Sequence, residues 1–135
     1  MLPRLSALLL GLALLFAAAT DYIPAFIDAE GRVFGLFRLD IYKDALHVAS
    51  ALWAFAAAAI SRRAAVLFLG LFGALYFGDG LIGVATGSGF LDLSIFIVGV
   101  VKEPEIVRLL SSLPHVGLGA FGLIVAWLSA RNPTA

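Results

Sequence analysis

Four long stretches without charged side chains divide this chain. They cover residues 5–20, 45–61, 64–78 and 109–130, and the third continues past a single acidic residue to position 91. With their apolar flanks they approach the roughly 20 residues that an α-helix needs to cross a hydrocarbon core about 30 Å thick. The chain is 62% hydrophobic with a mean hydropathy of +1.06, far above a soluble domain. The pattern predicts an all-α integral membrane protein.

The charges between these stretches are sorted by sign. The segments that hold Arg4, Arg62, Arg63 and Arg131 contain no acidic side chain, whereas the connections 21–44 and 87–112 are rich in carboxylates. Arginine and lysine stay on the cytoplasmic side of short loops. We therefore expect a single domain, 1–135, with both termini in the cytoplasm. Its fold would be an up-down bundle of four transmembrane helices, with spans of about 5–26, 44–61, 64–86 and 112–130 and apolar outer connections 27–43 and 87–111.

The first span has two interpretations. Arg4, the apolar run after it and the alanines at 17–19 are typical of a cleavable signal peptide. However, apolar residues resume at Tyr22-Ile23 and continue to Ile27, which would extend the segment across a bilayer. The pairing of spans described next requires a first helix. We expect this span to be retained.

An internal repeat relates the second span to the fourth. His47-Val48 recurs as His115-Val116, and a serine follows each histidine by fourteen residues, with an arginine close behind. The first and third spans match more weakly, through Arg4 with Arg63 and Gly11-Leu12 with Gly70-Leu71. Because each unit crosses twice, the two copies would be parallel and related by an axis along the membrane normal.

Local signals predict where the helices begin and how they pack. Asp44 and Ser112 each precede a histidine by three residues, where a side-chain oxygen would cap the first turn, and Pro114 is tolerated there. Gly70, Ala74 and Gly78 recur every four residues, which predicts a small-residue face on the third helix.

Three ionisable residues, His47, Asp79 and His115, lie within the spans or at their outer ends. Helix rise places all three about 22–24 Å above the arginine-bearing ends, in one layer near the outer surface. If the histidines face each other with Asp79 orienting them, this layer would bind a metal, hold a haem between two axial ligands or pass protons. The alternatives are a polar rim that contacts headgroups and a structural His–Asp hydrogen bond. No third nitrogen ligand exists, so no metal site is predicted.

The composition argues against cysteine-dependent chemistry and nucleic-acid binding. The absence of cysteine excludes disulfides, iron–sulfur centres and a thiol nucleophile, and a net charge of zero offers no surface for nucleic acid. Two G-x-G-x-x-G matches, at 78–83 and 117–122, lie inside apolar spans without a preceding strand, so we interpret them as packing glycines. Nothing in the sequence argues for an enzyme.

Two segments carry a resemblance to a known family. Gly35-Leu36-Phe37 runs into the helix start Asp44-Ala45-Leu46-His47, and a second start, Ser112-Leu113-Pro114-His115, occurs in the last helix. This arrangement resembles a bacterial family of small four-helix integral membrane proteins of unknown function, in which an Asn- or Asp-x-x-His start recurs. Here serine replaces the usual asparagine in the second copy. The resemblance implies the architecture and residence in the bacterial inner membrane, and it supplies no activity.

Two functions remain from different classes. The first is a non-enzymatic structural or accessory protein that packs with lipid, with itself as a homo-oligomer or with another membrane protein through its small-residue faces. The alternative is a haem, metal or proton-transfer site formed by His47, Asp79 and His115. No cofactor is required by the first function.

Overall fold

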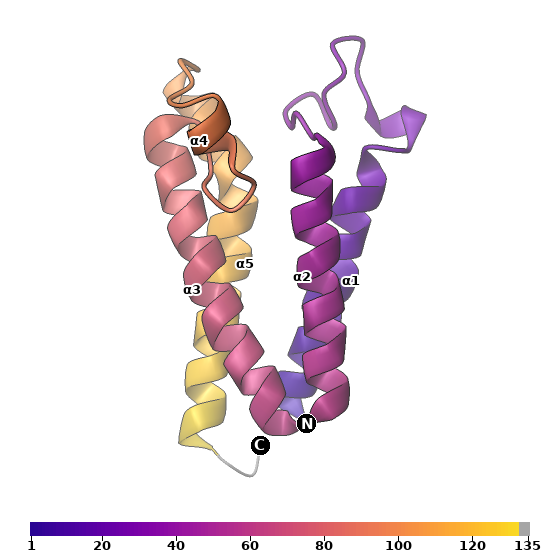
Figure 1. Ribbon diagram of the computed structural model, residues 1–135, viewed down its shortest axis with the longest axis vertical. Coiled ribbons are helices and arrows are strands. Elements are labelled where there is room, and N and C mark those ends of the chain that lie inside the picture. Colours follow the sequence, from indigo (N-terminus) through magenta and orange to yellow (C-terminus); the bar gives the residue numbers. More distant parts are fainter. Residues whose placement is uncertain (133–135) are drawn as a thin grey trace.

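The computed structural model describes residues 1–132, and that part of the chain is helical without named strands (Figure 1). Two isolated antiparallel bridges, Ile27 with Val33 and Val33 with Phe37, shape the first outer connection. The prediction of an all-α protein is confirmed. The helices are α1 (Leu2–Thr20), the 3-10 turn η1 (Pro24–Phe26), α2 (Ile41–Ile60), α3 (Arg62–Thr86), α4 (Ser94–Ile97) and α5 (Glu105–Arg131).

Three of these helices, α1, α3 and α5, are long and apolar enough to cross a membrane. The prediction of a membrane protein is therefore confirmed at this level. Helix α2 has 20 residues but falls outside this group. Its first two turns carry Lys43, Asp44 and His47, which lower its mean hydropathy.

The long helices form two hairpins, α1 with α2 and α3 with α5, and these two pairings are the most extensive helix–helix contacts, that of α3 with α5 above all. Figure 1 shows the hairpins meeting at the end that holds the N-terminus and the α2–α3 turn, and separating toward the end that holds both outer connections. The turn is a single residue, Ser61, which ends α2 and caps α3 by accepting a hydrogen bond from the Ala64 amide. Such a short turn forces α2 and α3 to be antiparallel neighbours.

Small residues let the first hairpin close around the core. A row of buried alanines on α2 (Ala51, Ala54, Ala57 and Ala58) contacts Leu10 and Leu14 of α1 and the aromatic face of α3 within one buried cluster. Gly11 lies directly under the Phe55 ring, where an added Cβ would come within 2.5 Å of Cε1. Small side chains on α2 and Gly11 on α1 thus leave room for the large side chains that fill the core, among them Leu14, Phe68 and Phe72.

Glycines bring α3 and α5 into backbone contact in the second hairpin. A Cβ on Gly73 would lie 2.6 Å from the Leu123 amide nitrogen, and one on Gly122 would lie 2.8 Å from the Leu69 carbonyl oxygen. Gly119 meets the Phe77 backbone in the same way. Helix α3 therefore does pack closely through glycines, but the closest contacts with α5 are made by Gly73 and Gly80 rather than by the predicted Gly70 and Gly78.

Helix ends differ from the expected ones at three places. The N-cap of α2 is Asp40, whose carboxylate accepts from the Tyr42 and Lys43 amides, so the prediction of Asp44 as the cap was wrong. Helix α5 begins at Glu105, after the short helix α4, and therefore contains Ser112 and Pro114 in its interior. The prediction that Ser112 caps the last helix was wrong because the amphipathic segment before it continues the same helix. Helix α1 ends at Thr20, and Pro24 opens a separate 3-10 turn.

At the end of the bundle near the α2–α3 turn, an arginine caps the last helix of each hairpin. The Arg4 Nε donates to the Ala58 carbonyl at 2.6 Å, at the C-terminal end of α2. Arg62 Nη2 donates to the Ser129 carbonyl at 2.7 Å, at the C-terminal end of α5. In each hairpin an arginine at the start of the first helix thus satisfies free carbonyls at the end of the second, where the helix dipole also favours a cation.

The glycine contact between α3 and α5 generates a stability prediction. Gly119→Ala should lower the free energy of unfolding by about 1–3 kcal/mol, the cost typical of overpacking, because its methyl group would meet the Phe77 backbone. Gly117→Ala is the matched control, since a Cβ there has no neighbour within 4 Å and alanine is the better helix former. Unfolding in detergent micelles, followed by helical circular dichroism, measures both. Equal effects of the two substitutions would contradict the close contact.

Candidate functional site

A cavity of about 660 Å³ lies between the two hairpins at their outer end. Its walls come from α1, α2, α3 and α5, and both outer connections contribute to its rim. The opening follows from the packing: each hairpin holds itself together through alanine and glycine contacts, and the two hairpins separate toward this end. The volume falls within the range of small-molecule pockets, about 300–1,000 Å³.

The structure brings the three candidate residues together in this cavity. His47 from α2, Asp79 from α3 and His115 from α5 all line it. The two imidazole rings lie 5.9 Å apart between centroids, with an angle of 85° between their planes. The His115 Nδ1 lies 2.6 Å from the Asp79 Oδ2. The arrangement in which the histidines face each other and Asp79 orients one of them is therefore the one observed.

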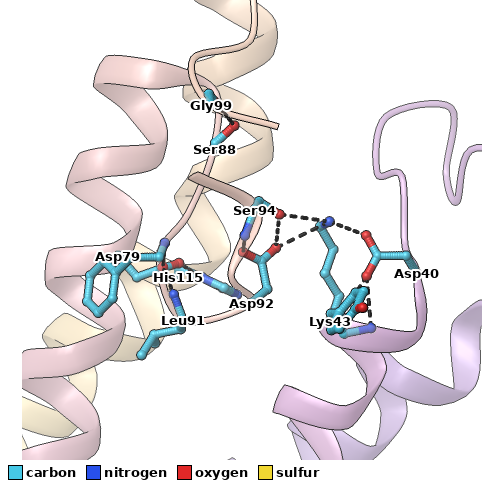
Figure 2. Close-up of polar contacts among 11 residues, drawn as sticks. Asp40, Lys43, Asp79, Ser88, Leu91, Asp92, Ser94, Gly99 and His115 are labelled. Atoms are coloured by element: carbon cyan, nitrogen blue, oxygen red, sulfur yellow. Dashed lines mark hydrogen bonds and ion pairs between the residues drawn. The ribbon is translucent and has the colours of Figure 1, made fainter. Parts of the chain in front are cut away.

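Asp79 is a buried carboxylate whose acceptors are all used. It is 3% exposed. Its Oδ1 accepts hydrogen bonds from the backbone amides of Phe90 and Leu91, at 2.6 and 2.8 Å, and its Oδ2 faces His115 (Figure 2). Gly89 permits this approach, since a Cβ there would lie 2.7 Å from the Asp79 Oδ1. Asp79 thus fixes both the second outer connection and the orientation of the His115 ring.

His47 differs from His115 in its surroundings. Its side chain is buried, with 8% exposure, and its Nδ1 has no hydrogen-bond partner among the described residues. A buried polar atom without a partner carries a desolvation penalty of about 1–3 kcal/mol. Because His47 also lines the cavity, a bound molecule would be able to remove that penalty.

Two polar residues that the sequence analysis did not single out continue this layer into the bundle. The Tyr76 ring lies 4.8 Å from the His115 ring, and its hydroxyl shares a 2.8 Å hydrogen bond with the Ser50 hydroxyl. Tyr76 precedes Asp79 by three residues on α3, and Ser50 follows His47 by three on α2. Polar residues three apart on an apolar helix share a face, and that spacing is the sequence signal that would have found them.

A lysine connects the two hairpins above the histidines. Figure 2 shows the Lys43 side chain between two groups. One is Asp40, the N-cap of its own helix α2, and the other is Asp92 with Ser94 on the second outer connection. Its Nζ lies 2.5 Å from the Asp40 Oδ2 and 3.2 Å from the Asp92 Oδ2. Burial raises the pKa of Asp40, but the Lys43 ammonium and the first amides of α2 outweigh it and hold the pKa below its ordinary value. No sequence pattern relates Lys43 to Asp92, because they lie in different connections.

The other predicted features fall into place around this site. Gly80 and Gly83, in the first glycine motif, approach Val116 and Ser112 of α5, which supports their interpretation as packing residues. Within residues 1–132, no group of three or more His, Cys, Asp or Glu side chains is arranged to hold a metal ion.

The lowered pKa of Asp40 predicts a pH dependence. A carboxyl whose pKa is lower in the folded state stabilises the fold above the unfolded pKa, about 4, and this contribution disappears as the pH falls through the folded value. Unfolding midpoints measured between pH 7 and pH 3 should therefore fall less steeply for Asp40→Asn than for the wild type. Asp21→Asn is the control, because the Asp21 carboxylate has no ion pair among the described residues. An unchanged slope for Asp40→Asn would contradict the assignment.

The chain was compared with family models, curated proteins and solved structures. No family model, no curated protein and no solved structure matches the chain.

Proposed function

We propose that this chain is a non-enzymatic, four-span protein of the bacterial inner membrane that binds a small molecule in the outward-facing cavity between its hairpins. The observation that carries the proposal is the pair of imidazoles, 5.9 Å apart in a 660 Å³ cavity, one of which has a buried nitrogen without a partner. Pockets of this kind combine a mostly apolar wall with a few convergent polar groups.

Support for a fourth crossing comes from α2. It is 20 residues long, about 30 Å at the rise of an α-helix, and its polar residues gather in the first turns. Helices α1, α2 and α3 run side by side, and the only turn between α2 and α3 is Ser61. The equivalent arginine caps, Arg4 on α2 and Arg62 on α5, support two parallel copies of one hairpin.

Reporter fusions test this topology. Green fluorescent protein fused after Ser61 or after Ala135 should fluoresce, because both positions would be cytoplasmic. Alkaline phosphatase fused after Gly89 should be active, because that position would be periplasmic. Phosphatase activity at Ser61 would show that α2 does not cross the membrane, and a mature N-terminus at Thr20 would show that α1 is removed.

Binding of a small molecule in the cavity between the hairpins has more support than a purely structural or accessory role. The accessory hypothesis relied on small-residue faces that would contact lipid, another copy or a partner. Gly73, Gly119 and Gly122 instead pack against the neighbouring helix of the same hairpin. Large apolar side chains such as Leu12, Leu67 and Ile124 occupy the outer faces and suit contact with lipid tails.

A second candidate, a metal ion or haem iron between the imidazoles, is favoured by the spacing of the rings. His47 and His115, whose rings lie 5.9 Å apart at the same cavity, would be the residues that hold the metal, which would supply redox or Lewis-acid chemistry there. Asp79 on the His115 Nδ1 would then serve as the outer partner that metal-ligating histidines usually have.

A matched pair of substitutions on α1 tests the pocket. Ala17 lines the cavity, whereas Ala13, one turn away, is exposed and does not. Ala17→Trp should fill the cavity and remove a co-purifying small molecule from native mass spectra, and Ala13→Trp should retain it. Loss in both, or retention in both, would contradict binding in this cavity.

Absorbance and metal analysis of the same samples separate the two candidates. A Soret band or stoichiometric metal that disappears in His115→Ala would establish the metal-centred alternative. An organic mass without metal supports the first.

A further inference from the structure

We infer that the ligand is a neutral, hydroxylated amphiphile of the alkyl hydroquinone class, held by its phenolic hydroxyls on His115 and His47. This inference rests on the proposed function and specifies its ligand. Four properties of the cavity lead to it: its size, the identity of its walls, its charge and the tautomer of His115.

Size and wall chemistry favour an organic molecule. A cavity of about 660 Å³ is much larger than one ion with its waters requires, and no triad of metal-ligating side chains occurs within residues 1–132. Leu14, Phe16, Leu46 and Leu118 supply apolar wall from α1, α2 and α5. The ligand therefore needs an apolar body as well as a polar head.

The charges around the cavity disfavour an anionic head. Four carboxylates line it, against three cationic side chains: Asp40, Asp79, Asp92 and Glu103, against Arg32, Arg38 and Lys43. Lys43 is already bonded to Asp40 and Asp92, and the Arg32 Nε donates to Asp28 at 2.9 Å, so Arg38 alone of the three has no ion pair among residues 1–132. A fatty acid or phosphate headgroup would meet more negative than positive charge here. A neutral head avoids that repulsion.

The hydrogen bonds of Asp79 fix what His115 offers to the ligand. Backbone amides only donate, so the Asp79 Oδ1 acts as an acceptor toward Phe90 and Leu91. We infer that Asp79 is an ionised carboxylate, and its Oδ2 then accepts from the His115 Nδ1, which lies 2.6 Å away. In the neutral imidazole the proton is then on Nδ1, and Nε2 carries a lone pair. His115 therefore presents an acceptor, which a hydroxyl group satisfies and a carbonyl group does not.

His47 supplies a second polar contact for the same head. Its ring lies 5.9 Å from that of His115, and its buried Nδ1 has no hydrogen-bond partner in the part of the chain that the structure describes. A hydroquinone carries two hydroxyls that both donate and accept, so it satisfies either tautomer of His47. The oxidised quinone has only acceptors and cannot donate to His115.

Decyl-hydroquinone and decyl-quinone are the matched probes. The full chain is placed in phosphatidylcholine nanodiscs, and binding is measured anaerobically by calorimetry, with empty nanodiscs as the blank. The wild type should bind the hydroquinone about tenfold more tightly than the quinone, roughly the difference of one hydrogen bond to a buried group. Equal affinity for the two forms would overturn the inference.

Asp79→Asn tests the tautomer argument directly. The asparagine Oδ1 can still accept from Phe90 and Leu91, but its amide would donate to the His115 Nδ1 and move the imidazole proton to Nε2. The preference should then shift toward the quinone. His115→Gln, whose amide both donates and accepts, should bind the two forms equally and serves if Asp79→Asn does not fold. An unaltered tenfold preference in either folded variant would overturn the inference.

The outcomes for the ligand and for the pocket are separable. If neither probe binds while Ala17→Trp still removes a co-purifying molecule that Ala13→Trp retains, the pocket exists and the hydroquinone assignment is wrong. If neither probe binds and the two tryptophan variants behave alike, the proposed function fails as well.

Discussion

A carboxylate buried among apolar helices organises the outer half of this protein. Burying an ionised carboxylate is costly unless hydrogen-bond donors surround it. Asp79 obtains them from three sources: two consecutive amides of the second outer connection and the imidazole of α5. The same requirement therefore folds the connection back over the bundle, links α3 to α5 and orients His115. The polar chemistry of the cavity follows from satisfying one side chain.

The cavity itself results from unequal packing. Glycines bring the backbones of α3 and α5 into contact, and buried alanines of α2 pack with Leu10 and Leu14 of α1 in one cluster. The hairpins join through the one-residue turn at Ser61, and arginine caps close the helix ends near it. At the other end Lys43 bonds to Asp92 across the gap. The two hairpins are therefore joined covalently at the arginine-bearing end, and the Lys43–Asp92 ion pair connects them at the end where the cavity opens.

Periodicity and charge predicted the coarse architecture because both are direct consequences of burial in lipid. Runs without charged residues predicted the long helices. The depth of His47, Asp79 and His115 along straight helices placed these residues in one layer, and the structure brings them together there.

The residues at which the helices begin were harder to predict. Asp40 and Asp44 are both good caps by residue type, and only the path of the preceding chain selects Asp40. Ser112 and Pro114 look like a start, yet the segment from Glu105 already forms the helix and tolerates the proline inside it. The Lys43–Asp92 contact depends on how two connections fold, which no local pattern encodes.

Of the two histidines, only His115 has a carboxylate hydrogen-bond partner among residues 1–132. In the proposed repeat, His47 would correspond to His115 and Thr20 to Asp79. Thr20 ends α1, and its hydroxyl donates to the Ala17 carbonyl instead of orienting a histidine. A symmetric pair of imidazoles is thereby made asymmetric. The His115 Nδ1 lies 2.6 Å from the Asp79 carboxylate, whereas the His47 Nδ1 has no hydrogen-bond partner among residues 1–132. For the proposed hydroquinone, this difference makes His115 the contact that distinguishes the reduced from the oxidised form, while His47 accommodates a hydroxyl in either tautomer.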